Sequence, residues 1–454
     1  MAAMTPASWA AGWGGADTPG TAATDRASGA TGRGGAGRPD AHAGRDSLDT
    51  DHIKSDFPVL AAAGDGDRIV YLDSASSSQK PRQVIDAMST YYESSHANVH
   101  RGLYRLASEA DRLYEEARTL TGRFIGATDP EREVVFTKNS TESINLVSFS
   151  WGYQNLQPGD VVVATEMEHH ANIVPWINLH ESRGIELRII PLGDDYELDL
   201  TSLDELLDGA KLVACTLMSN VLGTVPPFRR IADAAHAAGA LVLADGAQLV
   251  PHSPVDVRDL GCDFLAFSGH KMLGPTGIGV LWGRAELLDS MPPFMGGGGM
   301  IRDVRFEGIV PADIPTRFEA GTPPIAEAVG LGAAIRYLEA LGMDRIQAHG
   351  RALTEYAVSA LTARLGAGIE IMHPLDPEAG AVLSLALPGV HPHDVAQVLA
   401  DSGICVRAGH HCAKPLMRRL GVGATARASM YLYNDESDID ALGDALERAA
   451  KLFG

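Results

Sequence analysis

The stretches LVLADGAQ (241–248) and FLAFSGHKMLGPTGIGVL (264–281) decide the fold. Each begins with a short apolar run and then turns polar or glycine-rich. Such a run between turn signals is typical of a buried parallel strand. The first run ends at Asp245 and the second in Ser268-Gly-His-Lys271. Because open α/β sheets bind their ligands at the carboxyl ends of the strands, Asp245 and Lys271 are predicted to lie at a ligand site.

The same alternation extends outward along the chain. Apolar runs predict further strands at 134–137, 161–164, 187–190 and 212–216, and amphipathic patterns predict helices at 84–94, 108–125, 140–151, 173–183 and 228–238. The sequence therefore predicts an α/β fold with a helix-covered, mostly parallel sheet.

The remaining chain suggests three parts. Residues 1–47 are mostly Ala, Gly, Thr and Asp, which predicts a disordered tail; the segment lacks the apolar run of a secretory signal. We expect an N-terminal arm and large domain over 48–320 and a small C-terminal α+β domain over 321–454, which carries Cys412. The Gly/Pro-rich segment 292–324 is predicted to be a functional loop near this border.

Composition excludes several classes of protein. The chain has 454 residues, and 37 basic against 58 acidic residues give a formal net charge of −21. This charge argues against nucleic-acid binding and against binding at a membrane surface. No uncharged apolar run reaches the length of a membrane span. We expect a cytoplasmic protein.

Asp245 and Lys271 suit the chemistry of pyridoxal phosphate. A lysine can form a Schiff base with the cofactor aldehyde, and a carboxylate can keep the pyridine nitrogen protonated, which makes the ring an electron sink. The alternative is structural: Asp245 caps a helix and Lys271 lies on the surface. The occurrence of both at matching strand ends favours the cofactor.

The four cysteines differ in their surroundings. They are too few and too scattered for a disulfide framework. Cys215 and Cys262 lie in or beside apolar strands and Cys405 opens a predicted strand, so we expect them to be structural. Cys412 follows His410 and His411 in a polar loop, where positive neighbours favour the reactive thiolate.

With these residues the chain closely resembles the SufS-type (group II) cysteine desulfurases, which are class V enzymes of the fold-type I pyridoxal-phosphate group. The resemblance covers residues 50–454. Its motifs are YLDSASSSQKP (71–81), NVHRG (98–102), TKNSTESINLV (137–147), MEHHANIVPW (167–176), SNVLGT (219–224), LADGAQ (243–248), FSGHKMLGPTGIG (267–279), RFEAGTP (317–323), VRAGHHCAKPLM (406–417) and RASMYLYN (427–434).

The resemblance implies a role for each site residue. Catalysis would fall to Cys412 as nucleophile, to Lys271 and to His169, which would stack on the cofactor ring. The other implied cofactor contacts are Asp245, Gln248, Thr141, Ser268, His270, Asn220 and, from a partner subunit, Thr322. The implied substrate contacts are Arg427, Asn220, Arg407 and His100.

Part of this assignment has support from the residue types alone. Thr141 stands where a strand gives way to a helix, which suits a phosphate, although Ser140 and Thr141 are also good helix caps. An arginine fork suits a carboxylate, although Arg427 could instead form an ordinary ion pair.

The implied reaction converts L-cysteine to L-alanine and leaves a persulfide on Cys412, whose sulfur serves iron–sulfur cluster assembly. The resemblance also implies a homodimer. A dedicated sulfur acceptor is implied as well, since the short Cys412 loop limits how far the sulfur can travel. Selenocysteine lyase or cysteine sulfinate desulfinase activity on the same scaffold is the alternative. A non-catalytic binding protein would not need Lys271, Asp245 and Cys412 together. Ser76 and Pro324 depart from the family pattern, and neither is expected to touch a residue of the chemistry.

His393, in VHPHDVA (390–396), has two interpretations. In the first, it caps the following helix or faces solvent. In the second, which the resemblance implies for enzymes with this motif, it replaces a cysteine ligand on the zinc of a SufU-like acceptor. Relatives without this histidine use a zinc-free, SufE-like partner. The pairs His169-His170 and His410-His411 are not expected to bind a metal, because neighbours on a strand point to opposite faces.

Overall fold

A computed structural model describes residues 48–61, 68–100 and 102–453. The predicted tail (1–47) and Arg101 of the NVHRG motif lie outside these residues. Among the described helices, none is long and apolar enough to cross a membrane.

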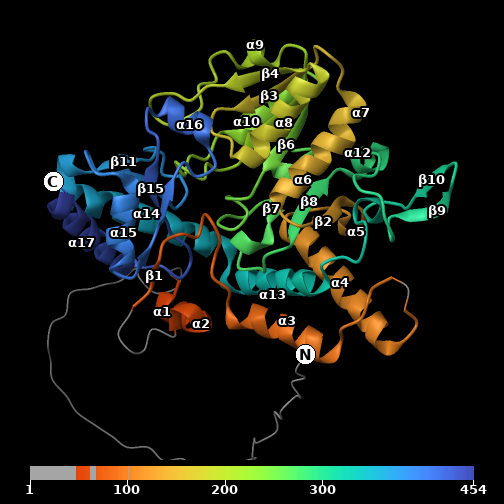
Figure 1. Cartoon of the computed structure of the whole chain (residues 1–454), viewed down its shortest axis with the longest axis horizontal. Coiled ribbons are helices and arrows are strands. Elements are labelled where there is room, and N and C mark those ends of the chain that lie inside the picture. Colours follow the sequence, from red (N-terminus) through yellow and green to blue (C-terminus); the bar gives the residue numbers. More distant parts are fainter. Residues whose placement is uncertain (1–47, 62–67, 101, 454) are drawn as a thin grey trace, which may run out of the picture. The chain divides into compact units, whose positions relative to one another are not determined.

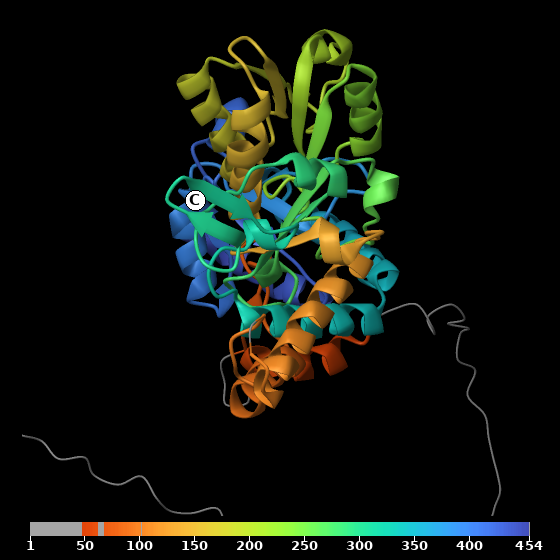
Figure 2. The same cartoon turned by 90° about the vertical axis from the view of Figure 1, so that its right-hand side faces the viewer.

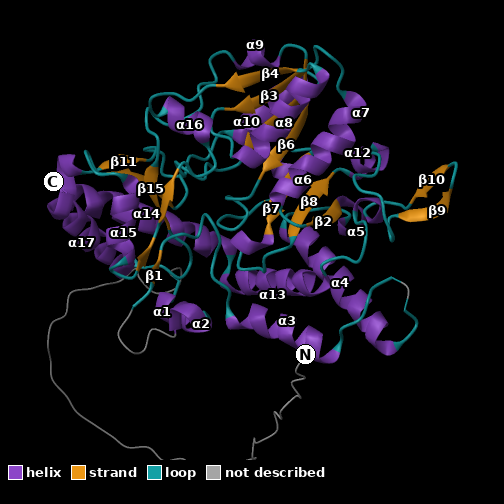
Figure 3. Cartoon of the chain, in the orientation of Figure 1, coloured by secondary structure: helices purple, strands orange, loops and turns teal. Residues whose placement is uncertain are grey.

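A seven-stranded sheet forms the centre of the large part of the fold (Figures 1 and 3). In spatial order its strands are β2 (Val134–Thr137), β8 (Gly279–Gly283), β7 (Phe264–Ser268), β6 (Leu241–Asp245), β5 (Ala210–Thr216), β3 (Val161–Thr165) and β4 (Glu186–Ile190). Within this sheet β8 runs in the direction opposite to the other six strands, so it is antiparallel to both β2 and β7. The predicted mostly parallel sheet and α/β class are confirmed, and β8 is the strand that the sequence pattern did not reveal.

Helices cover both faces of this sheet because its strands are apolar on both sides. On one face, α6 (Ser140–Leu146) and α8 (His170–Arg183) pack against residues such as Val162 and Leu243. On the other, α4 (Arg105–Phe124), α10 (Phe228–Ala237) and α13 (Ile325–Leu341) pack against residues such as Val163 and Val242. Buried strands of this kind are expected in a parallel sheet.

The helix predicted over 140–151 changes its winding. It begins as α6 and continues as the π-helix η1 (Val147–Gly152) and α7 (Tyr153–Asn155). Asn139 caps α6 by accepting a hydrogen bond from the Glu142 amide, so the alternative interpretation, in which Ser140 or Thr141 caps this helix, is wrong. A side chain at Gly279 would place its Cβ 2.3 Å from the Asn139 Cα, so this close approach of β8 requires glycine.

The C-terminal part has a sheet of its own, with the strand order β11 (Glu370–Met372), β12 (Val382–Ala386), β15 (Thr425–Ser429) and β14 (Arg407–Gly409). All its pairs are antiparallel. Its core also contains residues from α14 (Met343–Leu365), α15 (Pro392–Ala400) and α17 (Glu436–Phe453). The domain division at 320 and 321 stays a prediction.

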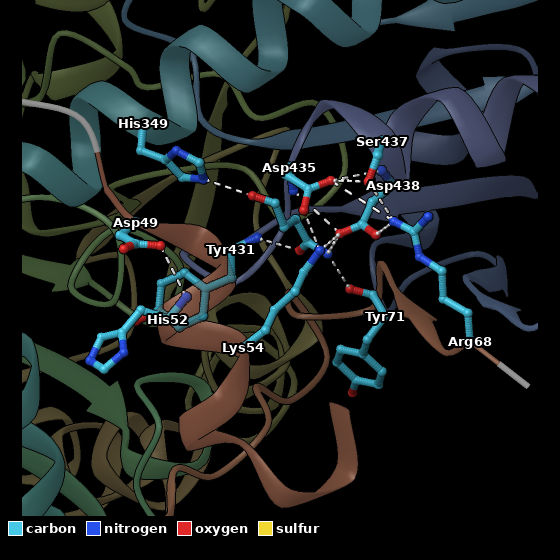
Figure 4. Close-up of polar contacts among 11 residues, drawn as sticks. Asp49, His52, Lys54, Arg68, Tyr71, His349, Tyr431, Asp435, Ser437 and Asp438 are labelled. Carbon is cyan, nitrogen blue, oxygen red and sulfur yellow. Dashed lines mark hydrogen bonds and ion pairs between the residues drawn. The ribbon is translucent and has the colours of Figure 1, made fainter. Parts of the chain in front are cut away.

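The N-terminal arm joins this C-terminal part through backbone and ionic contacts. Strand β1 (Val70–Tyr71) pairs with β13 (Ile404–Cys405), and an isolated bridge joins Asp73 to Ser429. Figure 4 shows Lys54 of α1 (Thr50–Asp56) and Arg68 converging on Asp435 and Asp438. These contacts fix the chain that enters the turn at residues 73–78, which borders the candidate site.

The segment 292–324 contains more regular structure than predicted. Strands β9 (Ile301–Arg305) and β10 (Gly308–Pro311) form a hairpin with exposed Val304, Phe306 and Ile309. Figure 2 shows this hairpin toward the viewer. The other short elements are α2 (Pro58–Ala61), α3 (Arg82–Ser94), α5 (Pro130–Glu133), α9 (Leu203–Leu207), α11 (Val257–Leu260), α12 (Ala285–Ser290), α16 (Lys414–Arg419) and the 3₁₀ turns η2 (Gly269–Lys271), η3 (Thr316–Phe318) and η4 (Gly366–Gly368).

Candidate active site

One cavity of about 580 Å³ gathers most of the predicted site residues. It lies where β5, β6 and β7 end, and the N-terminal arm and the loop after β14 close it. From the predicted set it is lined by Thr141, His169, Asn220, Asp245, Gln248, Ser268, His270, Lys271, His393, Arg407, Cys412 and Arg427. The expectation of a ligand site at these strand ends thus has a cavity to support it.

His100 and Thr322 do not line this cavity. His100 is 41% exposed and lies 3.8 Å from an Asp111 carboxylate oxygen. Thr322 lines a different hollow, with Glu319 and Pro324. Within one chain, then, these two residues are separate from the other predicted site residues.

Asp245 and Lys271 face one cavity from neighbouring strand ends. Burial lowers the pKa of Lys271 to about 8, and the Asp245 charge offsets part of that shift. Burial also raises the pKa of Asp245, which accepts a hydrogen bond of 3.0 Å from the Ala247 amide. Among the described residues, Lys271 Nζ has no hydrogen-bond partner, so its amine is available for chemistry.

His169 is a neutral imidazole that lines the same cavity. It is the N-cap of α8, and its Nδ1 accepts a hydrogen bond of 3.0 Å from the Ala171 amide. Burial and the Lys271 charge lower the His169 pKa to about 3. Because Nδ1 accepts, the ring proton is on Nε2.

Glu168 is a buried carboxyl group that the sequence analysis missed. It accepts hydrogen bonds from Thr165 Oγ1, Thr216 N and Asn172 Nδ2. Burial raises its pKa to about 8. These contacts join the ends of β3 and β5 to α8 and so fix the position of His169. The only signal in the sequence is an acidic residue between an apolar strand and a histidine pair.

Ser268, His270 and Thr141 also line the cavity. Ser268 Oγ accepts from the Ser140 amide at 2.9 Å and so links β7 to the start of α6. Burial lowers the His270 pKa to about 4. Lys80, which the sequence analysis also missed, donates to the His270 carbonyl at 2.9 Å, and burial lowers its pKa to about 7.

Arg427 lies buried in the cavity wall, with a side chain only 3% exposed. It donates to the Asn220 carbonyl at 2.9 Å, to Asp73 at 3.2 Å and to Ser76 Oγ at 2.7 Å. Arg407 binds the same Asp73 carboxylate at 3.1 Å. The expectation that Ser76 touches no residue of the chemistry is therefore wrong, because its hydroxyl contacts Arg427.

The Cys412 loop is held in a strained conformation. Residues His411 and Cys412 have φ values of 49° and 54°, which non-glycine residues rarely adopt. The loop is fixed from both sides: the His170 amide donates to the Cys412 carbonyl at 2.7 Å, and Asn220 Nδ2 donates to the His411 carbonyl at 2.7 Å. The fold therefore presents this exposed thiol in one backbone geometry.

The other cysteines are poor candidates for the nucleophile. Cys215 and Cys262 are buried and Cys405 is partly buried, whereas Cys412 is exposed. Burial raises the thiol pKa of all three alternatives. Only Cys412 lines the cavity with Lys271.

The histidine pairs do not lie on strands as assumed. His169 and His170 begin α8, and His410 and His411 follow β14. Among residues 48–61, 68–100 and 102–453, no group of three or more His, Cys, Asp or Glu is placed to hold a metal.

His393 is exposed and borders the cavity that contains Cys412. It does not cap α15, because His391 Nδ1 accepts the hydrogen bond from the His393 amide. The two imidazoles stack with centroids 5.2 Å apart. This excludes the capping interpretation and leaves the His393 ring accessible.

Comparison with known proteins assigns the chain to a family. The family described as Aminotransferase class-V matches residues 70–442, and the chain belongs to it.

The relatives narrow this class to cysteine desulfurases. A probable cysteine desulfurase of Streptomyces coelicolor is 52% identical over 90% of this chain and 98% of the relative. The cysteine desulfurase of Haloferax volcanii is 47% identical over 89% and 98%. The solved structure of the cysteine desulfurase CsdA from Escherichia coli has a TM-score of 0.83 and 39% identity, covering 90% of this chain and 100% of that one. The predicted relationship to cysteine desulfurases is confirmed.

Proposed function

We propose that this chain is a pyridoxal-phosphate-dependent cysteine desulfurase of the SufS type. It converts L-cysteine to L-alanine and retains the sulfur as a persulfide on Cys412, from which it passes to iron–sulfur cluster assembly. The observation that carries the proposal is the meeting of three groups at one cavity: the amine of Lys271, the carboxylate of Asp245 and the exposed thiol of Cys412.

The cavity residues fit the cofactor. A buried carboxyl group, a lysine amine without a hydrogen-bond partner among the described residues and a neutral imidazole meet at the strand ends, and hydroxyl groups line the same cavity. In this assignment Lys271 would hold the cofactor through its aldehyde, Asp245 would pair with the pyridine nitrogen, Gln248 with the ring hydroxyl, and His169 would contact the ring. Thr141, Ser268 and His270 would bind the phosphate. When bound, the cofactor withdraws electrons from the substrate carbon that bears the amine.

The chain's own groups orient the substrate. Arg427 and Asn220 receive the carboxylate of L-cysteine, assisted by Arg407. A guanidinium suits this task because its planar donors match two carboxylate oxygens. Lys271 would join the cofactor aldehyde as an unprotonated amine, and its lowered pKa of about 8 increases the unprotonated fraction near neutral pH.

Cys412 performs the sulfur transfer. Its thiolate attacks the substrate sulfur, an S–S bond forms and the substrate C–S bond breaks. The bonding electrons stay with the carbon fragment, which takes up a proton and leaves as L-alanine. The products are one alanine and one cysteine persulfide, so no external oxidant or reductant is consumed.

We also propose a homodimer. Thr322 and His100 lie outside the cavity of their own chain, which supports a position of Thr322 at a partner's site. Sedimentation analysis tests the dimer, and a monomer with full activity would contradict it.

The proposed acceptor is a zinc-bearing, SufU-like protein whose zinc accepts His393 as a ligand. Support comes from the exposed imidazole at the border of the Cys412 cavity, since neutral imidazole is a good zinc ligand. His393→Ala should keep basal cysteine turnover and lose stimulation by this acceptor. The matched control is His391→Asn, which keeps a capping side chain and should still be stimulated. Undiminished stimulation of His393→Ala, or stimulation by a zinc-free SufE-like protein alone, would contradict the proposal.

Two variants and one control variant test the desulfurase function. Lys271→Ala should lose the covalent cofactor link, seen in the absorbance spectrum, and all turnover. Cys412→Ser should keep the cofactor spectrum and release no sulfide, whereas Cys405→Ser should remain active. An active Lys271→Ala enzyme would refute the cofactor assignment. Turnover of cysteine, selenocysteine and cysteine sulfinate measured side by side separates the proposed activity from its alternatives.

A further inference from the structure

The hydrogen bonds of Arg427 leave its guanidinium without two adjacent free donors for a carboxylate. Its Nη1 donates to the Asn220 carbonyl, and its Nη2 donates to both Asp73 Oδ1 and Ser76 Oγ. A guanidinium nitrogen of the η type carries two hydrogens, so Asp73 and Ser76 use both donors of Nη2. Nε is buried and, among the described residues, has no hydrogen-bond partner.

The geometry of the guanidinium requires Nη2 for any binding of a carboxylate by two donors. A carboxylate can bind two donors either along the side, through Nε and Nη2, or at the end, through Nη1 and Nη2. Both arrangements need a hydrogen of Nη2. A substrate carboxylate that is gripped by two donors of Arg427 must therefore replace either Asp73 or Ser76.

Of the two partners of Arg427 Nη2, Ser76 is the one that a substrate carboxylate displaces more readily. Asp73 is charged and is held additionally by Arg407, whose Nη2 lies 3.1 Å from Asp73 Oδ2. Ser76 offers a neutral hydroxyl, and it lines the cavity, whereas Asp73 is not among the lining residues. Its hydroxyl also donates to Asp73 Oδ1 at 2.6 Å, a bond that orients the oxygen toward Nη2.

We infer that Ser76 is a built-in competitor of the substrate carboxylate for Nη2 of Arg427, and that it thereby sets how tightly the enzyme holds amino-acid substrates and products. This inference rests on the proposed role of Arg427 as the carboxylate ligand. A fixed hydroxyl with two hydrogen bonds is harder to displace than a mobile water molecule. Removal of the hydroxyl therefore tightens the binding of ligands that have a carboxylate, and leaves ligands without one unaffected.

The test compares L-alanine with ethylamine, which is the same molecule without the carboxylate. Dissociation constants are measured on the holoenzyme from the absorbance of the bound cofactor, and the quantity compared is the ratio of the ethylamine constant to the L-alanine constant. Ser76→Ala should raise this ratio about fivefold, the effect of roughly one net hydrogen bond. Ser76→Thr keeps the hydroxyl and should restore the wild-type ratio.

Two further variants complete the design. Ser77→Ala removes the neighbouring hydroxyl, which bonds to the His270 carbonyl instead of Arg427, and should leave the ratio unchanged. Arg427→Gln should lower the ratio toward one.

The outcomes separate the two claims. If Arg427→Gln leaves the ratio unchanged, the carboxylate role of Arg427 is wrong. If Arg427→Gln lowers the ratio but Ser76→Ala leaves it unchanged or lowers it, then Ser76 is not a competitor, and only the inference about Ser76 is overturned. A purely structural role of Ser76 would weaken both ligands equally and would also overturn it.

Discussion

Glu319 anchors the loop that leads to Thr322, and its neutralisation should destabilise the protein strongly. Its carboxylate binds Arg118 through two bonds of 2.8 and 3.0 Å, and it accepts from the Phe136 amide at 2.7 Å and from the Tyr114 hydroxyl at 3.1 Å. The side chains of Arg118 and Glu319 are only 3% and 6% exposed. Glu319→Gln keeps the shape and leaves the Arg118 charge buried without its main partner.

The expected cost follows from that burial. Breaking a buried ion pair by removing one partner costs about 3–5 kcal/mol. Glu115 also binds Arg118, at 3.0 Å, but is 47% exposed, and it offsets part of the loss. We therefore expect about 3 kcal/mol for Glu319→Gln, and below about 1 kcal/mol for the control Glu115→Gln, as measured for exposed pairs.

Urea unfolding of the holoprotein at one protein concentration measures both values. The double variant Arg118→Met/Glu319→Gln should lose less stability than Glu319→Gln alone, because it buries no unpaired charge. Equal costs for Glu319→Gln and Glu115→Gln would refute the reasoning.

Three further predictions concern stability. His411 is 6% exposed, and burial lowers its pKa from 6.5 to about 3. As pH falls, the unfolded state therefore takes up a proton at a higher pH than the folded state does. The contribution of His411 to the free energy of unfolding is present above pH 6.5 and is lost as pH falls toward 3. His411→Gln should reduce the slope of unfolding free energy against pH in this range by up to about 1.4 kcal/mol per pH unit, and an unchanged slope would contradict it. Lys54→Met should lower the free energy of unfolding in urea by about 1 kcal/mol, because Lys54 is 25% exposed and pairs with the buried Asp438. The control Lys451→Met should lower it by less than about 0.5 kcal/mol, because Lys451 is 78% exposed. Equal costs would argue against an anchoring role of the arm. Deletion of residues 1–45 should leave the melting temperature and turnover nearly unchanged, because their composition offers little to pack, and a large drop in melting temperature would contradict this.

The strands and helices with strong local patterns were predictable from sequence. Strands β2 and β7 lie where they were predicted, because each is a continuous apolar run between clear turn signals. Strand β8 was missed because it begins and ends with glycine, which suggests a loop. The π-helical turn η1 has no distinct signal in the sequence pattern, which continues the amphipathic pattern of α6.

The site was predictable where motifs carry the chemistry and not where distant segments meet. Lys271, Asp245 and Cys412 stand out by residue type and position. The contact of Ser76 with Arg427 arises because the N-terminal arm joins the C-terminal sheet, and the two residues are 351 positions apart. Glu168 and Lys80 gain their altered pKa values from burial, which a single sequence does not show.

The central claim is that Cys412 receives sulfur from a substrate bound at Lys271. The most direct test treats the holoenzyme with ³⁵S-labelled L-cysteine, without an acceptor or reductant, and maps the label by peptide mass spectrometry. The account predicts one extra sulfur atom on the Cys412 peptide and release of unlabelled L-alanine, with neither in Lys271→Ala. Label on Cys215, Cys262 or Cys405, or alanine formation by Cys412→Ser at the wild-type rate, would contradict it.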